Sequence, residues 1–537
     1  MTGSAEEAHG ETMDSPGLLR PFHQASWNEP IILELTSEGE RGIQVPEVED
    51  EIEAAVGDGV SQIPAGLRRT SPPALPELSQ PQVLRHYLRL SQETLGNDVN
   101  IHLGLGTCTM KYSPRVNEEL IRLPSVVDLH PLQDDDTVQG MLEVLYRFER
   151  VLCEISGLDR FTFQPAGGTQ AVYANAGMIR AYHESRGEGA QRDEIVTTIF
   201  SHPCDAATPT TAGFKLITLY PGERGYPDVE ALKAAVSERT AGLMITNPED
   251  TGIFNPHIDE YVEIVHDAGG LCHYDQANAN GVLGITRARE AGFDLCQFNL
   301  HKTFSSPHCS MGMPCGASGV TSELARFLPA PTVEYDGKRY YLDYDRPDSI
   351  GKVRAFHGVP ATVVRSYAWV LSLGGEGLRE VAEVAVLNNN YLAKKVSEIP
   401  GIEISFADGN SDPRLEQVRY SLGRLTEETG LGTMDVARRT ADFGVSTYFP
   451  SHEPWLVPEP MTLEPAESYS KADLDTYAAI LAQVSHEAYT DPELVRTSPH
   501  RSTVHQLDPG PLDDPERWAL TWRAHLKKTR AAGTRSA

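Results

Sequence analysis

The sequence predicts an α/β protein: a large domain built on a mostly parallel sheet, followed by a smaller α+β domain. Short β-rich runs recur between residues 194 and 300, with a clear helical pattern between two of them. Strand, helix, strand in that rhythm is typical of a parallel sheet wrapped by helices. Beyond Val320 the pattern changes to longer helices and then to a mixed region. A chain of 537 residues is long enough for two or more domains.

Five runs carry the strand signal. They are EIVTTIF from Glu194, FKLITLY from Phe214, GLMITN from Gly242, GLCHYD from Gly270 and DLCQFNL from Asp294. The pattern NPHIDEYVEIVHDAG separates the third run from the fourth, with Pro256 near its start and Gly269 past its end. Proline is favoured in the first helical turn and glycine just beyond the last one, so a helix is predicted here.

Further helices are predicted on both sides of this region. Before it, MLEVLYRFERVLCEISG has apolar residues at the spacing of one helix face, namely Leu142, Leu145, Phe148 and Leu152. After it, the run from Pro360 to Ile399 is interpreted as two long helices, and GIEISFA opens the α+β region. We predict an extended, partly disordered N-terminal arm over 1–80, a large domain over 81–350, and a small C-terminal domain with its tail over 351–537.

Composition argues against several classes of partner. The formal net charge of −30 would make most of the surface repel nucleic acid and anionic membranes. The seven cysteines are scattered without a CxxC pair, which favours reduced thiols and suggests no metal site. No apolar run approaches the ~20 residues of a membrane helix, and the start MTGSAEEAHGETMDS lacks signal-peptide features. We expect an untargeted cytoplasmic enzyme that binds neither nucleic acid nor membrane.

The first candidate site element is the strand-to-helix turn in FTFQPAGGTQAVYANAGMIRAY. Gly167, Gly168 and Thr169 are small, and small residues let the backbone approach an anion. The following helix would present free N–H groups and a positive dipole end, as phosphate-binding turns do. The same three residues also form ordinary strand-to-helix turns, so this signal alone does not decide between the two.

Three side chains follow predicted strands further along the chain. Asp275 ends an otherwise apolar strand, where open α/β sheets bind ligands, although it is equally suited to cap a helix. Lys302, in FNLHKTFSSPH, becomes an amine nucleophile if it is partly desolvated and is otherwise a surface charge. His202, in IFSHPCDAATPTTAGF, is placed either to stack on a planar ring or to support a turn.

The combination is more specific than its parts. A phosphate cradle, a strand-end carboxylate and a later lysine are the three contacts that pyridoxal phosphate needs. The carboxylate would keep the ring nitrogen protonated, so that the ring withdraws electrons from the α-carbon of an amino acid. We therefore predict pyridoxal phosphate as the cofactor.

The chain resembles the glycine decarboxylase P-protein family (glycine dehydrogenase, decarboxylating), most closely its subunit 2 form. The resemblance runs from about Glu29 to Asp508. It rests on the stretches LGLGTCTMKYSPRVNEE, HPLQDDDTVQGMLE, FTFQPAGGTQ, ITNPEDTGIF, HDAGGLCHYDQANANGVLG, GFDLCQFNLHKTFSSPH, GKVRAFHG, GGEGLREVAEVAVLNNNYL and LEPAESYSK. It implies the fold-type I architecture of pyridoxal phosphate enzymes.

The resemblance also implies roles for single residues. Lys302, in NLHKTF, would be the Schiff-base lysine, Asp275 would pair with the pyridinium nitrogen, and His202 would stack on the ring. These three are the predicted catalytic residues. The predicted cofactor-binding residues are Gly167, Gly168, Thr169, His202, Thr246, Asn247, Asp275, Asn278, Asn299, His301 and Lys302.

The activity implied by the resemblance is decarboxylation of glycine. Glycine would form an external aldimine with the cofactor and lose carbon dioxide, and the carbanion would attack the lipoyl disulfide of a carrier protein. Fold-type I sites commonly lie at a dimer interface, so a homodimer is expected, with a subunit 1-like chain or a lipoyl carrier as further partners. No clear arginine for the substrate carboxylate emerges; Arg354 and Arg365 are candidates by position only.

Several loops depart from the family pattern. Cys309, Ser310, Met311 and Met313 stand where the family has a run of glycines, and SHPCDAATP replaces AHGTNPAS. GVSTYFPSHEPW stands around the position of the family's HPPT segment, and His357, Gly358 and Val359 replace YGN. We assign Cys309 and Cys315 structural or pocket-lining roles ahead of redox chemistry.

These departures keep two alternatives open. The first is a diverged pyridoxal phosphate enzyme of specialised metabolism, which would act on another amino acid by decarboxylation, carbon-carbon bond formation or transamination without a lipoyl carrier. The second is a non-catalytic subunit that supports a separate catalytic chain. Retention of Lys302 and Asp275 argues against the second.

Overall fold

The computed structural model describes residues 19–20, 22–73, 75–96, 99–101, 103, 108–109, 111–306, 314–445, 450–503, 505–506 and 521–533. The chain divides into two compact units, one formed by 1–20 with 100–496 and the other by 21–99 with 497–537. The three-part division at 80/81 and 350/351 stays a prediction. None of the described helices is both long and apolar enough to cross a membrane.

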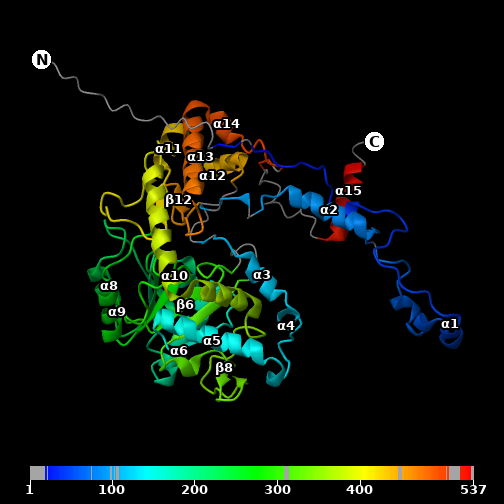
Figure 1. Ribbon diagram of the computed structural model, residues 1–537, viewed down its shortest axis with the longest axis horizontal. Helices are drawn as coiled ribbons and strands as arrows, with labels where there is room; N and C mark the ends of the chain where they lie inside the picture. The colour runs from blue at the N-terminus through cyan, green and yellow to red at the C-terminus, as the bar shows by residue number, and fades with distance from the viewer. Residues whose placement is uncertain are drawn as a thin grey trace. The chain divides into compact units, whose positions relative to one another are not determined.

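A seven-stranded mixed sheet forms the centre of the first unit (Figure 1). In spatial order its strands are β1 (Arg160–Thr162), β7 (Gly316–Val320), β6 (Leu295–Asn299), β5 (Leu271–Gln276), β4 (Thr240–Thr246), β2 (Glu194–Thr198) and β3 (Lys215–Leu219). The pairs from β6 to β3 are all parallel, whereas β7 runs antiparallel to both of its neighbours. All five predicted strands are confirmed.

The sheet is buried on both faces, as parallel sheets are. Successive side chains of a strand point to opposite faces, so in β4 Met244 packs in one hydrophobic cluster while Leu243 and Ile245 pack in the other. Helix α6 (Gly168–Ser185) contributes to the first cluster, and α5 (Gln139–Ser156) and α9 (Ile258–Asp267) contribute to the second. The predicted helices over these two segments are confirmed.

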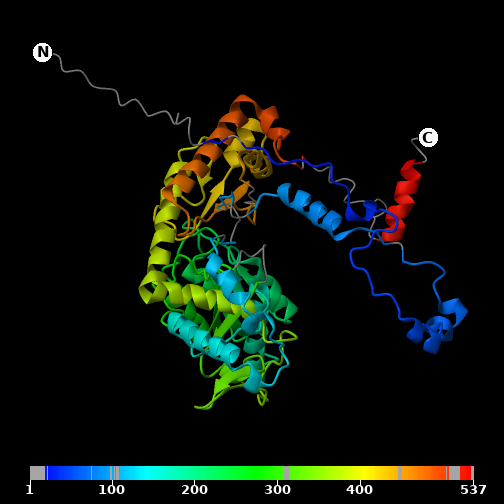
Figure 2. The ribbon, with the colours of Figure 1, turned by 45° about the vertical axis from the view of Figure 1, so that its right-hand side comes forward.

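Helix α10 (Pro360–Val396) links this sheet region to a smaller one. Its interior is interrupted at Gly374, where φ is +67°, so the prediction of two helices over this run is confirmed. Side chains on both sides of Gly374 pack in the cluster of the large sheet, and the last turns pack in a separate cluster with α13 (Lys471–Thr490). Helices α10 and α13 lie side by side in both views (Figures 1 and 2).

The smaller region has the α+β character expected from GIEISFA onward. Its antiparallel sheet joins β10 (Glu403–Ile404), β11 (Val418–Ser421) and β12 (Pro460–Leu463). Other helices of the first unit are α3 (Arg115–Ile121), α4 (Pro124–Val127), α7 (Pro203–Thr211), α8 (Val229–Ala235), α11 (Gly423–Thr429), α12 (Thr433–Thr440) and α14 (Pro492–Arg496).

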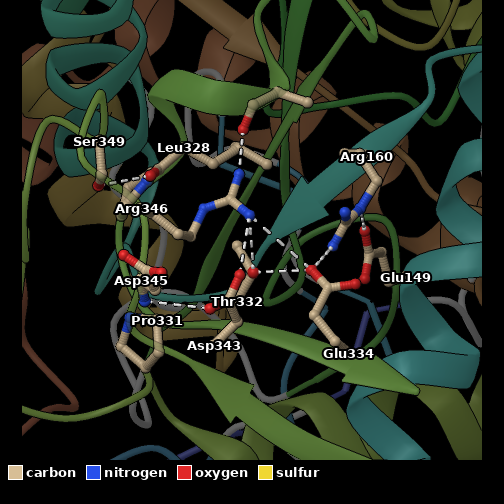
Figure 3. A network of polar contacts seen from close by, with 12 residues as sticks. Glu149, Arg160, Leu328, Pro331, Thr332, Glu334, Asp343, Asp345, Arg346 and Ser349 are labelled. Carbon is tan, nitrogen blue, oxygen red and sulfur yellow. Dashed lines mark hydrogen bonds and ion pairs between the residues drawn. The ribbon is translucent and has the colours of Figure 1, made fainter. Parts of the chain in front are cut away.

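Strands β8 (Thr332–Tyr335) and β9 (Tyr340–Asp343) form a hairpin, which ion pairs connect to the large sheet (Figure 3). Arg160 of β1 contacts Glu149 of α5 at 2.6 Å and Glu334 of β8 at 2.7 Å. Arg346 donates to Thr332 at 3.2 Å from the far side of the same network. Burial alone would lower the pKa of the Arg160 guanidinium, but the two carboxylates around it outweigh that effect and raise its pKa.

The second unit contains α1 (Asp50–Val56), α2 (Gln80–Gln92) and α15 (Trp522–Gly533). Ser79 and Gln82 form a capping box at the start of α2. Glu29 receives hydrogen bonds from His86 at 2.8 Å and Arg89 at 3.0 Å, which tie the preceding segment to this helix. Many large apolar side chains between 43 and 88 are exposed.

Substituting Gly358 with alanine is expected to destabilise the first unit. Gly358 has φ of +83°, and a Cβ there would lie 1.8 Å from the carbonyl oxygen of Phe163. Left-handed strain and the overlap together should lower the free energy of unfolding by about 2 kcal/mol or more. Gly351→Ala is the control, because its φ is also positive (+85°) but nothing lies within 4 Å of its Cβ. Equal melting temperatures for the two variants would contradict the steric argument.

Candidate active site

A cavity of about 370 Å³ opens at the carboxyl ends of β5 and β6, the sheet edge at which open α/β folds bind ligands. Its volume falls within the range of small-molecule and cofactor sites. Eight predicted site residues line it: Gly167, Gly168, Thr169, His202, Asp275, Asn299, His301 and Lys302. These eight residues come from four separate segments of the chain, which therefore meet in one cavity.

The turn before α6 has the geometry of an anion cradle. Helix α6 begins at Gly168, and no side chain hydrogen-bonds at its N-cap, Gly167. A Cβ at Gly168 would lie 2.7 Å from Nδ2 and 2.8 Å from Oδ1 of Asn299, so a larger residue would require that amide to shift. Oδ1 of Asn299 is buried without a hydrogen-bond partner in the described part of the chain. The first turn of α6 thus offers N–H groups toward the cavity.

Asp275, near the end of β5, is 2% exposed. Its Oδ1 accepts hydrogen bonds from the backbone N–H of Ala277 at 2.8 Å and from the side chain of Gln297, while its Oδ2 lies 3.8 Å from the thiol of Cys204. Burial raises the pKa of Asp275, and the Ala277 hydrogen bond and the Lys302 charge oppose that rise. The carboxyl is oriented through one oxygen, which leaves the other for a further donor.

His202 lies immediately before α7 and caps that helix. Its Nδ1 accepts from the backbone N–H of Cys204 at 3.1 Å. Burial lowers the pKa of His202 to about 3, and the charge of Lys302 acts in the same direction. His301 is similar, because burial lowers its pKa to about 4. Both imidazoles are therefore neutral at physiological pH, which suits stacking on a ring.

Lys302 occupies a turn after β6 and is 4% exposed. Its neighbour Thr303 fixes the turn twice: its carbonyl oxygen accepts from Nζ of Lys111 at 2.8 Å, and its Oγ1 accepts from the N–H of Ala279 at 2.9 Å. Lys111 is itself buried and paired with Glu467 at 2.9 Å. The partly buried Lys111–Glu467 ion pair thus helps to fix the backbone next to Lys302.

A smaller hollow adjoins the cavity and shares His202, Asp275 and Lys302 with it. The predicted residues Thr246 and Asn278 line this hollow. Asn247 lines neither space, because its side chain bonds the backbone of Asn255 at 2.9 and 3.2 Å. Its cofactor contact stays a prediction.

Carboxyl groups near the hollow were missed by the sequence reasoning. Glu416 lines the hollow, and Oε1 of Glu464 accepts from Thr109 and Asn278, each at 2.6 Å. Burial raises the pKa of Glu416 to about 8 and that of Glu464 to about 7. The stretch LEPAESYSK pointed to this region, but nothing in its pattern showed that Glu464 would be buried beside the site.

Other predicted residues lie elsewhere. Arg365 forms a bidentate pair with Glu118 at 2.7 and 2.9 Å, and neither it nor Arg354 is among the described residues that line the cavity. Cys315 is buried with its thiol 3.5 Å from the carbonyl oxygen of Phe163. Cys309 and its neighbours Ser310, Met311 and Met313 lie outside the described residues.

The thiols agree with the sequence analysis where they are described. No disulfide joins the described cysteines, which are Cys108, Cys153, Cys204, Cys272, Cys296 and Cys315. Cys108 and Cys204 line the cavity, which the sequence did not predict. Gln297 was missed as well, although its position in the strand that leads to Asn299 was a usable signal.

Comparisons with known proteins agree with this arrangement. Residues 381–500 match the family model for the C-terminal domain of glycine dehydrogenase. A probable glycine dehydrogenase (decarboxylating) subunit 2 from Pyrococcus abyssi is 45% identical over 492 residues, 91% of this chain and 95% of that protein. A protein of the same name from Thermococcus kodakarensis is 44% identical over 509 residues, 94% of this chain and 98% of its own length.

Solved structures show the fold. An inhibitor-bound glycine decarboxylase (P-protein) of the glycine cleavage system matches with a TM-score of 0.66 and 21% identity, over 82% of this chain and 100% of its own. The cysteine desulfurase CsdA from Escherichia coli matches with a TM-score of 0.54 and 14% identity, over 76% of this chain and 99% of its own. The expected fold-type I architecture is confirmed. By its similarity to these relatives over nearly its whole length, the chain belongs to the glycine dehydrogenase (decarboxylating) subunit 2 family.

Proposed function

We propose that this chain is a pyridoxal phosphate-dependent enzyme that decarboxylates glycine as subunit 2 of a glycine dehydrogenase. The observation that carries the proposal is the convergence of three groups on one cavity: the uncapped start of α6, the buried carboxyl of Asp275 and the buried amine of Lys302. Each offers the chemistry that one part of the cofactor needs. The family relationship supports the same function.

The residues present fit the cofactor. The first turn of α6 would hold the phosphate, because Gly168 leaves room for close approach and Thr169 adds a hydroxyl. The amine of Lys302 would carry the aldehyde, and Asp275 would accept from the ring nitrogen. When bound, pyridoxal phosphate supplies an electron sink for the bond that breaks at the α-carbon of the substrate.

The protein's own groups would prepare the site for this chemistry. Neutral His202 would lie against the ring without adding a charge that competes with the protonated ring nitrogen. Glu464, with its pKa near 7, would be able to hold or release a proton close to neutral pH. Asn278 and Thr246 would face the substrate side, where no arginine has been found among the described lining residues.

The expected partners follow from the same proposal. A subunit 2 would act with a subunit 1-like chain, and the aminomethyl carbon that remains after loss of carbon dioxide would pass to a lipoyl carrier. A homodimer stays our expectation from the fold. One observation supports the alternative of a diverged enzyme without a lipoyl carrier. The loop from His202 to Asp205 places a cysteine and a carboxyl beside Asp275.

Replacing Lys302 with alanine is expected to abolish covalent cofactor attachment. Borohydride reduction followed by peptide mass analysis should find pyridoxyl label on Lys302 of the parent protein and none on Lys302→Ala. Turnover should fall by roughly 10²-fold or more, the scale of a lost positioned acid-base group. Lys338→Ala, at an exposed hairpin turn, is the control. Label on another lysine with full turnover would contradict the assignment.

Gly168→Ala is expected to weaken cofactor binding more than Gly167→Ala. The new methyl group at 168 would overlap the amide of Asn299, whereas a Cβ at 167 would meet Pro314 at an ordinary 3.5 Å. An overpacking cost of about 1–3 kcal/mol corresponds to roughly a 5- to 150-fold rise in Kd. Absorbance titration of the apoproteins with pyridoxal phosphate measures the Kd values. Equal values for the two variants would argue against the phosphate cradle.

Exchange of labelled bicarbonate into glycine is expected to require a lipoylated carrier protein, with a subunit 1-like chain present. Glycine alone among a panel of amino acids should perturb the visible absorbance of the holoprotein. If glycine gives no response while a bulkier amino acid shifts the band and releases carbon dioxide without a carrier, the diverged-enzyme alternative holds. Purified protein that binds no cofactor under any condition would instead indicate a non-catalytic subunit.

A further inference from the structure

We propose that Asp205 is a positioning residue that stays protonated and donates a hydrogen bond to Asp275. The two carboxyls would then share one proton and present a single negative charge to the cofactor ring nitrogen. The effect on the cofactor rests on the proposed function, whereas the contact between the two carboxyls does not. It assigns a role to a residue that the sequence analysis quoted only as part of SHPCDAATP.

Asp205 is fully buried and lies close to Asp275. It lies in the first turn of α7 and is 0% exposed. One of its carboxyl oxygens, a carboxyl oxygen of Asp275 and the thiol of Cys204 all lie within 4.8 Å of one another. Within the described chain, neither oxygen of Asp205 has a hydrogen-bond donor and no cation forms an ion pair with it. A carboxylate buried in this way would be unsolvated on both oxygens.

A proton on Asp205 removes this difficulty. Two ionised carboxylates this close in a buried site repel each other, so one of them takes up a proton. Asp275 is the better anion of the two, because Ala277 and Gln297 donate to its Oδ1 and the charge of Lys302 favours ionisation. Protonated Asp205 then becomes a donor, and Asp275 gains the further partner that its second oxygen can accept.

The charges around Asp205 agree with this assignment. Asp275 of β5 faces it most closely, and Asp250 adds a second acidic group, although Arg419 pairs with Asp250 at 2.8 Å. Cys204 and His202 on its own element are both neutral at physiological pH. The positive end of α7 favours an anion, but burial and the two acids outweigh it and raise the pKa of Asp205.

The position also has a neutral equivalent. An asparagine amide and a protonated carboxyl have similar shapes, and both can donate one hydrogen bond while adding no charge. Asp205→Asn is therefore the conservative variant, and Asp205→Ala removes the donor.

The first test uses apoprotein, so it does not depend on the cofactor. Infrared difference spectra between the parent and Asp205→Asn at pH 7 should show one protonated carboxyl band that the variant lacks. Asp193→Asn is the control, because Asp193 is paired with Lys215 and Arg239 and its pKa is lowered. The Asp193→Asn substitution should remove the band of an ionised carboxylate instead. Loss of an ionised band in Asp205→Asn would overturn the proposal.

Thermal unfolding of the same proteins gives a second readout. A carboxyl with a raised pKa in the folded state stabilises the fold below the pKa of the unfolded chain, and this stability is lost as pH rises toward the folded pKa. Asp205→Asn lacks that loss, so its melting temperature should exceed that of the parent by a margin that grows from pH 5 to pH 8. A margin that shrinks with pH would overturn the proposal.

The holoprotein shows whether the pair acts on the cofactor. Without its donor, Asp275 becomes more basic, so the pH titration of the visible band should shift in Asp205→Ala and be restored in Asp205→Asn. Equal shifts in both variants would overturn the positioning role. A metal ion that co-purifies with the parent and is absent from Asp205→Ala would do so as well. If no variant binds cofactor while the infrared band is present, the proposed function fails and the proton pair stands.

Discussion

The burial of Asp275 is the constraint on which the site depends. A carboxyl removed from water must be solvated by the protein, and the surrounding groups meet that need one by one. Ala277 and Gln297 donate to one oxygen, Lys302 supplies the compensating charge, and the α7 loop supplies the groups beside the other oxygen. Because these groups come from three separate segments, 204–205, 275–277 and 297–302, the sheet has to form before the carboxyl has its partners.

Much of the fold was predictable because the sequence signals were local. The parallel strands are short apolar runs that end in polar residues, and α9 between two of them has an apolar face, so periodicity was sufficient for these elements. The run of α10 was predicted as two helices, and the structure places the interruption at Gly374. The arm and the tail have weaker patterns, and nothing local in them specified that 21–99 and 497–537 would form one unit.

The site was predictable where one residue type implies one chemistry. Lysine after a strand, aspartate at a strand end and paired glycines before a helix are recognisable in one dimension, and Lys302, Asp275 and Gly168 do line one cavity. Roles that arise from packing were not predictable. Glu464 and Glu416 come from the smaller region, and only the folded chain shows that they are buried beside Lys302. Asn247 shows the opposite case, since its side chain is used within its own loop.

Helix α10 has a mechanical consequence for this arrangement. The segment after Gly374 packs through Leu378 and Val381 in the core of the large sheet and through Leu392 and Val396 in the core of the smaller region. A continuous helix between the two contacts works as a rigid strut, because bending it would break backbone hydrogen bonds. The smaller region therefore cannot rotate away from the large one without loss of packing at one end of the strut. The position of Glu464 relative to Lys302 therefore depends on the helix that joins the two regions carrying them.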